Sequence, residues 1–254
     1  MLSDLLPAGL FAVLLVFVRV GASLSLLPVF GEAYVTPRLR LVVALVIALL
    51  LAPVLADGLP PMPAEPAALL VLILGEALVG IFLGTLARMF MSALTTAGMV
   101  MAYMSSLANA LVSDPTAEQQ GSVAGSFLSV TALLLIVTLD LHHMLLIAVI
   151  DSYSLFAPGV APPLGDFSEL MARTVAKTFL LAIQISTPFI AVGAIFYLGL
   201  GLLARLMVQL PIFFVGLPAQ ITLGLFVMLV TFPAALLWFL NYYQTTFTRL
   251  LLPE

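Results

Sequence analysis

Long apolar stretches alternate with short polar connections along the whole chain. A helix that crosses the hydrocarbon core of a bilayer needs about 20 mainly apolar residues. Six stretches reach or approach this length, and they cover residues 5–29, 39–56, 67–87, 126–150, 178–204 and 212–240. The pattern therefore predicts an all-α integral membrane bundle of about six hydrophobic helices or helical hairpins.

Residues 88–125 resemble neither the apolar stretches nor the short polar connections. They are rich in Met, Ser, Thr, Ala and Gly, and they end in a polar run at residues 113–120. The segment is too polar for a helix that faces lipid and too apolar for an ordinary loop.

Proline and glycine mark the connections, because proline removes a backbone donor and glycine favours turns. The connection after the second stretch contains Pro60, Pro61, Pro63 and Pro66, and the one after the fourth contains Pro158, Gly159, Pro162 and Pro163. We expect both connections to be free of helix. No composition shift divides the chain, so residues 1–254 are predicted to form a single membrane domain.

Four more prolines lie in or beside the last two apolar stretches, at Pro188, Pro211, Pro218 and Pro233. Each removes a helical hydrogen bond, and in lipid the freed carbonyl needs another partner. They predict broken helices that are buried in an assembly.

Small residues recur at four-residue spacing in Gly80-x-x-x-Gly84 and Gly121-x-x-x-Gly125. This spacing allows close approach between the backbones of membrane helices. We expect tight helix packing at both places.

Composition excludes several classes of protein. Hydrophobic residues make up 63% of the chain and charged residues 8%, which leaves too little charge to cover a water-facing surface. There is no cysteine, so disulfides and thiolate metal sites are excluded. With Lys177 as its one lysine and a net charge of -4, the chain is not expected to bind nucleic acid. No basic residue precedes Arg19, so we expect the first apolar segment to be retained and not cleaved as a signal peptide.

Arg19 and Glu76 lie inside apolar segments, where a charge costs about 2.5–3.5 kcal/mol on insertion scales. Two interpretations stay open. The residues form an ion pair that fixes helix packing, or they line a pathway for a solute or proton, as in a small-solute transporter.

Asp140, His142 and His143 lie in the fourth stretch. A metal site there lacks a convincing third and fourth ligand, because the chain has no other histidine and no cysteine. We interpret the three residues as a segment end in contact with headgroups or a partner. No set of nucleophile and base is visible either, so we predict no enzyme activity, no cofactor and no metal.

An ordered set of motifs spans nearly the whole chain and resembles the flagellar FliR family of type III export-gate proteins. The set comprises Phe17-Val18-Arg19-Val20-Gly21, Leu27-Pro28-Val29-Phe30-Gly31, Pro37-Arg38-Leu39-Arg40, Gly75-Glu76, Gly80, Gly84, Arg88, Ala97-Gly98-Met99, Asp114-Pro115, Phe127-Leu128, Asp140-Leu141-His142-His143, Ser152-Tyr153, residues 198–205, residues 213–218 and Leu223-Gly224. The chain departs from the family pattern at Leu141, where glycine is usual, and at Val208, where proline is usual.

The resemblance implies a core subunit of the flagellar protein export gate in the bacterial inner membrane, at the basal body. Its implied partners are FliP and FliQ in a hetero-oligomeric channel, FlhB and FlhA of the export apparatus, unfolded flagellar proteins as substrates, and membrane lipid. An equivalent subunit of a virulence injectisome stays open as an alternative.

The resemblance also implies a channel plug or gating loop near residues 103–120. The expected plug residues are Tyr103, Met104, Ser105, Ser106, Leu107, Asn109, Asp114 and Pro115. Methionine is an adaptable side chain that suits a seal around varied sequences. We expect Arg19, Glu76 and Arg88 to serve helix packing or assembly.

Overall fold

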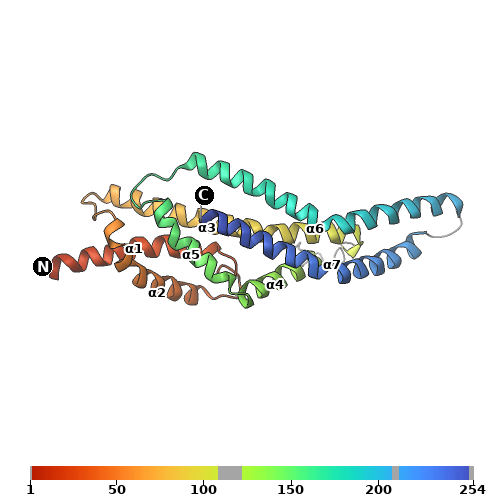
Figure 1. The fold of residues 1–254 in the computed structure, drawn as a ribbon, viewed down its shortest axis with the longest axis horizontal. Coiled ribbons are helices and arrows are strands. Elements are labelled where there is room, and N and C mark those ends of the chain that lie inside the picture. The colour runs from red at the N-terminus through yellow and green to blue at the C-terminus, as the bar shows by residue number, and fades with distance from the viewer. Residues whose placement is uncertain (1, 108–121, 208–211, 252–254) are drawn as a thin grey trace. The chain divides into compact units, whose positions relative to one another are not determined.

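The computed structural model describes residues 2–107, 122–207 and 212–251, and all regular structure in these ranges is helical. In chain order the elements are α1 (Leu2–Leu26), α2 (Pro37–Leu55), the short 3₁₀ helix η1 (Ala56–Gly58), α3 (Pro66–Met104), α4 (Val123–Thr138), α5 (Leu141–Leu155), α6 (Leu164–Leu206) and α7 (Ile212–Leu251) (Figure 1). Five of the described helices are long and apolar enough to cross a membrane, or six if α4 and α5 together form one span. The predicted all-α bundle of about six apolar helices is confirmed.

Helix α3 is longer than the sequence predicts. The expected helix ended at residue 87, but α3 runs through the softer region as far as Met104. Between Arg88 and Met104 there is no proline and no further charge, so nothing in this stretch interrupts the backbone hydrogen bonds. The polarity of its Ser and Thr side chains was a poor guide, because a hydroxyl can donate to a carbonyl of its own helix, as Thr95 does to Ser92.

The fourth apolar stretch is two helices instead of the single segment expected at residues 126–150. α4 ends at Thr138, α5 begins at Leu141, and the two are bent by 77° at the break. Asp140 adopts the left-handed conformation there, with φ 57°. Aspartate tolerates this region of backbone space better than most residues do, and the left-handed residue ends the helical path.

Prolines act differently in the connections and inside the helices. Residues 59–65 and 156–163 contain no helix, as predicted. Pro188, Pro218 and Pro233 were expected to break α6 and α7, yet both helices continue through them. Membrane helices tolerate such prolines where the packed bundle offers other partners to the freed carbonyls. Pro211 lies outside the described residues.

The chain separates into two compact units. The first comprises Met1–Met89, Ile136–Thr174 and Thr245–Glu254. Within it α1 and α2 run antiparallel side by side (Figure 1). α2 buries only small side chains, namely Ala44, Ala48 and Ala52, at the helical spacing of four. These alanines let the two backbones approach closely, as in other membrane helix pairs.

The second unit comprises Phe90–Leu135 and Val175–Gln244. Here α3 meets α4 at Gly98 and Gly125, where a Cβ added to Gly98 would clash with the backbone of Gly125. The ring of Phe127 on α4 stacks on that of Phe232 on α7, with centroids 4.8 Å apart. Close packing at Gly125 was predicted from the sequence, whereas Gly121 lies outside the described residues.

Candidate gating and assembly sites

A buried ion pair joins α1 to α3 in the first unit. Arg19 Nε lies 2.6 Å from Glu76 Oε2, and Arg19 Nη2 donates to Glu76 Oε1 at 3.1 Å. The side chains are 1% and 4% exposed. Such a two-pronged contact between guanidinium and carboxylate is the strongest geometry for this pair, and it neutralises two charges that are costly inside a membrane.

Arg19 also holds the C-terminal end of α5. Its Nη1 donates to the carbonyl and hydroxyl oxygens of Ser152 at 3.2 and 3.3 Å, and Nη2 donates to the Phe156 carbonyl at 2.9 Å. The guanidinium carbon lies 4.0 Å from the ring centroid of Tyr153. Arg19 has five N–H groups and meets five acceptor atoms, so its hydrogen-bonding capacity is used within the chain.

Two glycines bring α3 close enough for this contact. A Cβ added to Gly80 would overlap the Arg19 carbonyl, and one added to Gly84 would lie 2.8 Å from the Ser23 carbonyl. The predicted close approach at Gly80-x-x-x-Gly84 is therefore confirmed, with α1 as the partner helix. The small residues and the ion pair serve the same helix contact.

A pocket of about 1000 Å³ lies beside the ion pair. Its lining includes Arg19, Glu76, Glu65 and Asp166 among mostly apolar residues. Because the Arg19 donors are already occupied, the pocket does not present a free cationic group to an anionic solute.

The root of the expected plug packs on α6 and α7 in the second unit. Gln220 on α7 donates through Nε2 to the Met104 carbonyl at 2.7 Å and lies 2.8 Å from the Tyr197 hydroxyl on α6. Gln220 is 5% exposed. Met104 is the last residue of α3, so its carbonyl has no hydrogen-bond donor within the helix. The Gln220 amide supplies that donor.

Small residues form sockets for the same segment. A Cβ added to Gly193 would lie 3.2 Å from the Met104 sulfur, and one added to Gly224 would overlap Ser105. Ser105 is buried and donates to the Met101 carbonyl at 2.7 Å. Ser106 then takes a left-handed conformation, with φ 58°, which turns the chain away from the helix.

The structure brings some of the sequence-predicted residues into contact and leaves others apart. The structure brings Arg19 and Glu76 together, and it places Met104 and Ser105 against α6 and α7. Tyr103 and Arg88 are exposed, and Arg88 lies twelve residues beyond Glu76 on α3, about 18 Å along the axis at 1.5 Å per residue. Ser106 is buried and Leu107 half-buried, whereas Asn109, Asp114 and Pro115 lie outside the described residues.

Sequence reasoning missed Gln220, Tyr197 and the capping role of Arg19. Gln220 carried a usable signal, because a lone amide inside an apolar helix needs a partner. The acceptors of Arg19 at α5 carried none, since two of the three are backbone carbonyls.

Comparison with known proteins assigns the family. The family described as "Bacterial export proteins, family 1" matches residues 10–246. Flagellar biosynthetic protein FliR of Caulobacter vibrioides is 36% identical over 211 residues, which are 83% of this chain and 84% of the relative. FliR of Bacillus subtilis is 33% identical over 230 residues, with 89% and 86% covered, and FliR of Escherichia coli is 28% identical over 215 residues, with 85% and 82% covered.

These matches cover both compact units and include the positions of Arg19, Glu76, Met104 and Gln220 within the matched range. Together with the five or six membrane-length apolar helices, they describe a multi-pass membrane protein. The chain belongs to the FliR family of bacterial export proteins.

Proposed function

We propose that this chain is a core subunit of the flagellar type III export gate in the bacterial inner membrane. In this proposal it forms a channel with FliP and FliQ, associates with FlhB and FlhA, and passes unfolded flagellar subunits. The chain acts as one membrane domain and carries out no chemistry of its own. The observation that carries the proposal is the family match over residues 10–246.

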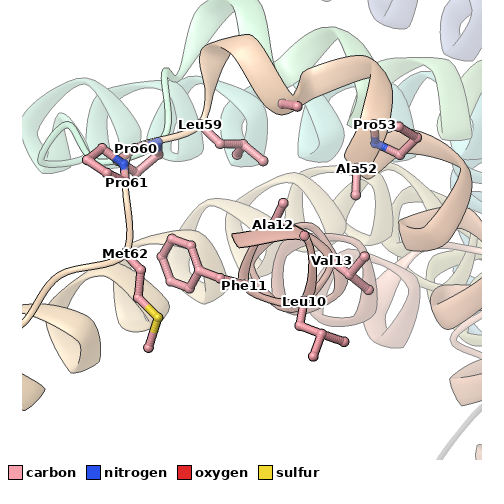
Figure 2. A pocket seen from close by; sticks show the side chains of 12 residues that line it. Leu10, Phe11, Ala12, Val13, Ala52, Pro53, Leu59, Pro60, Pro61 and Met62 are labelled. Carbon is pink, nitrogen blue, oxygen red and sulfur yellow. The ribbon is translucent and has the colours of Figure 1, made fainter. Parts of the chain in front are cut away.

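Exposed apolar surface supports an assembled state. α2 alone exposes Leu45, Val46, Leu49, Leu50 and Val54, each by 41% or more. Figure 2 shows an apolar pocket of about 630 Å³ between α1, α2 and the connection that follows η1, with Phe11, Ala52 and Met62 among its lining. Contiguous apolar surface of this kind needs lipid or a partner subunit to cover it.

The buried ion pair argues against a transporter. A binding site for a solute or coupling ion requires groups that are available to the ligand. The five acceptors around Arg19 all come from this chain, and they tie α1, α3 and α5 together. We propose that Arg19 and Glu76 maintain the packing of the first unit.

The contacts at the end of α3 support a gating role for the segment that follows. A plug must be held at its root and free to leave the channel at its tip. Gln220, Gly193 and Gly224 provide such a root for Met104 and Ser105. We propose that residues 103–107 anchor a plug whose further residues include Asn109, Asp114 and Pro115.

The proposal is tested by purification and by genetics. A tagged chain co-expressed with FliP and FliQ of the same bacterium should carry both partners through detergent extraction and size-exclusion chromatography. A strain that lacks the gene should lose motility and the secretion of flagellar proteins, and the gene supplied in trans should restore both. A chain that purifies alone as a stable monomer and transports a small solute in liposomes would contradict the proposal.

A further inference from the structure

Three potential metal ligands converge at the break between α4 and α5. Asp140, His142 and His143 each offer a ligand atom, and these three atoms lie within 4.8 Å of one another. The Asp140 carboxylate is 3.6 Å from Nδ1 of His143, and the two imidazole rings have centroids 4.1 Å apart. The sequence interpretation set a metal aside because further ligands were lacking. The geometry supplies three.

At the break, Asp140 does not act as a helix cap. Asp140 stands at the N-cap of α5, where an aspartate normally accepts a hydrogen bond from the first turn. Here its side chain makes no capping hydrogen bond, and its backbone has φ 57°. The carboxylate is instead turned toward His143, so a helix-capping role does not explain it.

His142 adds a second and independent observation. Its Nδ1 is buried and has no hydrogen-bond partner among the described residues. Buried polar atoms almost always have a partner, and one without a partner calls for an explanation such as a bound ion. A cation that binds through this nitrogen would satisfy it.

The connection between α1 and α2 lies beside His142. The ring of Phe30, in the connection between α1 and α2, lies 6.5 Å from that of His142. Arg40 holds this connection, because its guanidinium donates to the carbonyls of Phe30, Glu32 and Val35 at 2.9, 3.3 and 3.4 Å. His142 thus packs beside a loop that Arg40 stabilises, which helps to hold one ligand in place, as a metal site requires.

Solvent can reach the cluster. The side chains of Asp140 and His143 are 76% and 62% exposed. Ligands at about 2.1 Å from a tetrahedral ion lie about 3.4 Å apart, so the Asp140–His143 distance of 3.6 Å already fits. The positive end of α5 opposes a cation, and the negative charge of Asp140 offsets that effect.

We propose that Asp140, His142 and His143 bind a divalent first-row transition cation, with Zn²⁺ as the leading candidate. Two imidazoles and one carboxylate are a ligand set that such ions accept, while Mg²⁺ and Ca²⁺ prefer oxygen ligands alone. Three ligands from the chain leave one position for water. The ion pins the N-cap and the first turn of α5 to each other.

The composition of the chain limits metal binding through imidazole or thiolate to this cluster. It has two histidines and no cysteine, so any binding through imidazole or thiolate reports this cluster. The full chain is purified in detergent with a tag that contains no histidine, stripped with a chelator and titrated with Co²⁺. Visible absorption follows Co²⁺ binding, and Zn²⁺ then displaces the Co²⁺. We expect about one ion per chain and a rise in Tm with Zn²⁺ by mass action.

Variants identify the ligands. His142→Gln, His143→Gln and Asp140→Asn should each lower the affinity for Co²⁺ at least about tenfold, because even an outer-shell partner is worth roughly 10–100-fold. Asp151→Asn, a carboxylate on α5 outside the cluster, is the matched control and should bind as the wild type does. Circular dichroism of the metal-free variants checks that they fold.

Two results would overturn the proposal. The wild-type chain binds no more Co²⁺ than a variant that carries both His142→Gln and His143→Gln. Alternatively, Asp140→Asn binds as tightly as the wild type, which reduces the cluster to an adventitious pair of surface histidines. Neither result bears on the export-gate proposal, which does not depend on a metal.

Discussion

Arg19 is 1% exposed in an apolar helix, and its free energy in that place depends on Glu76. When one partner of a buried pair is removed, the other is left as an uncompensated charge, at a cost of about 3–5 kcal/mol. Replacement of both partners by apolar residues of similar size is often neutral. The same contact therefore gives opposite results in single and double variants.

We predict that Glu76→Gln lowers the stability of the folded chain by about 3–5 kcal/mol, because the guanidinium keeps its charge and loses its carboxylate. The measurement is thermal or denaturant unfolding of the purified chain in detergent. The Glu76→Gln substitution should also reduce the amount of complex recovered with FliP and FliQ.

The matched control is Glu169→Gln, which removes an exposed ion pair with Arg173 and should change stability by less than about 1 kcal/mol. The double variant Arg19→Met with Glu76→Leu should recover much of the loss. Normal stability and assembly of Glu76→Gln, with altered ion dependence of export, would favour a conducting role instead.

At the residue scale the sequence identified both charges, because a charge in an apolar stretch stands out. It left their role open between packing and a pathway. The contacts that favour packing are with the Ser152 and Phe156 carbonyls, and every residue has a carbonyl. No side-chain pattern could have predicted which of them end up beside Arg19.

At the scale of elements, the proposed gating role depends on the end of α3 and its supports on α6 and α7. The Gln220 amide on α7 donates to the Met104 carbonyl and to the Tyr197 hydroxyl on α6. One side chain therefore links α6 and α7 to the root of the proposed plug. Replacement by an apolar side chain leaves the Met104 carbonyl without that donor.

We predict that deletion of residues 105–111 leaves the complex with FliP and FliQ assembled and raises the leakage of small solutes. Gln220→Leu should raise leakage to a lesser extent, because it loosens the root without removing the segment. Efflux of a small dye from liposomes that contain the purified complex measures both.

Thr222→Val is the control on the same helix, since the Thr222 hydroxyl is exposed and bonds the Pro218 carbonyl in the preceding turn of its own helix. It should leak as the wild type does. Unchanged permeability after the deletion, with normal assembly, would count against a plug.

Element ends were predicted unevenly. Proline-rich connections were right because proline acts locally. α3 was predicted too short because the Ser and Thr residues of the softer region suggested polarity that a helix can accommodate. The α4–α5 break was missed because it depends on a single position in an apolar background. Asp140 was the available signal for the break, since an aspartate within an apolar stretch favours a turn.

At the scale of the whole molecule, hydropathy states where apolar surface lies and not what covers it. The chain contains one tryptophan, Trp238 on α7, and its side chain is 47% exposed in the isolated chain. Leu237 beside it and Leu229 two turns earlier are exposed as well. Trp238 is therefore a natural reporter of whether lipid or protein covers this helix.

We predict that brominated lipid quenches the fluorescence of Trp238 in liposomes that hold the chain alone, and that assembly with FliP and FliQ reduces this quenching. The complex with Trp238→Phe supplies the background from partner tryptophans. Equal quenching in both states would mean that α7 faces lipid in the assembly.

Composition alone predicted the membrane class, because 8% charged residues cannot cover a water-facing surface. It could not predict the two compact units, since α3 and α6 contribute residues to both and their apolar sequence runs without interruption. Treatment of residues 1–254 as a single membrane domain remains a proposal.

The contacts of Arg19 impose an order on synthesis. Glu76 follows Arg19 by 57 residues and Ser152 follows it by 133. At roughly 5–20 residues per second, a ribosome needs about 3–11 seconds to reach Glu76 and longer to reach Ser152. During that interval the first helix carries a charge with no partner in the chain. We therefore expect the insertion machinery to keep α1 near water, or to supply a temporary counter-charge, until Glu76 has been translated.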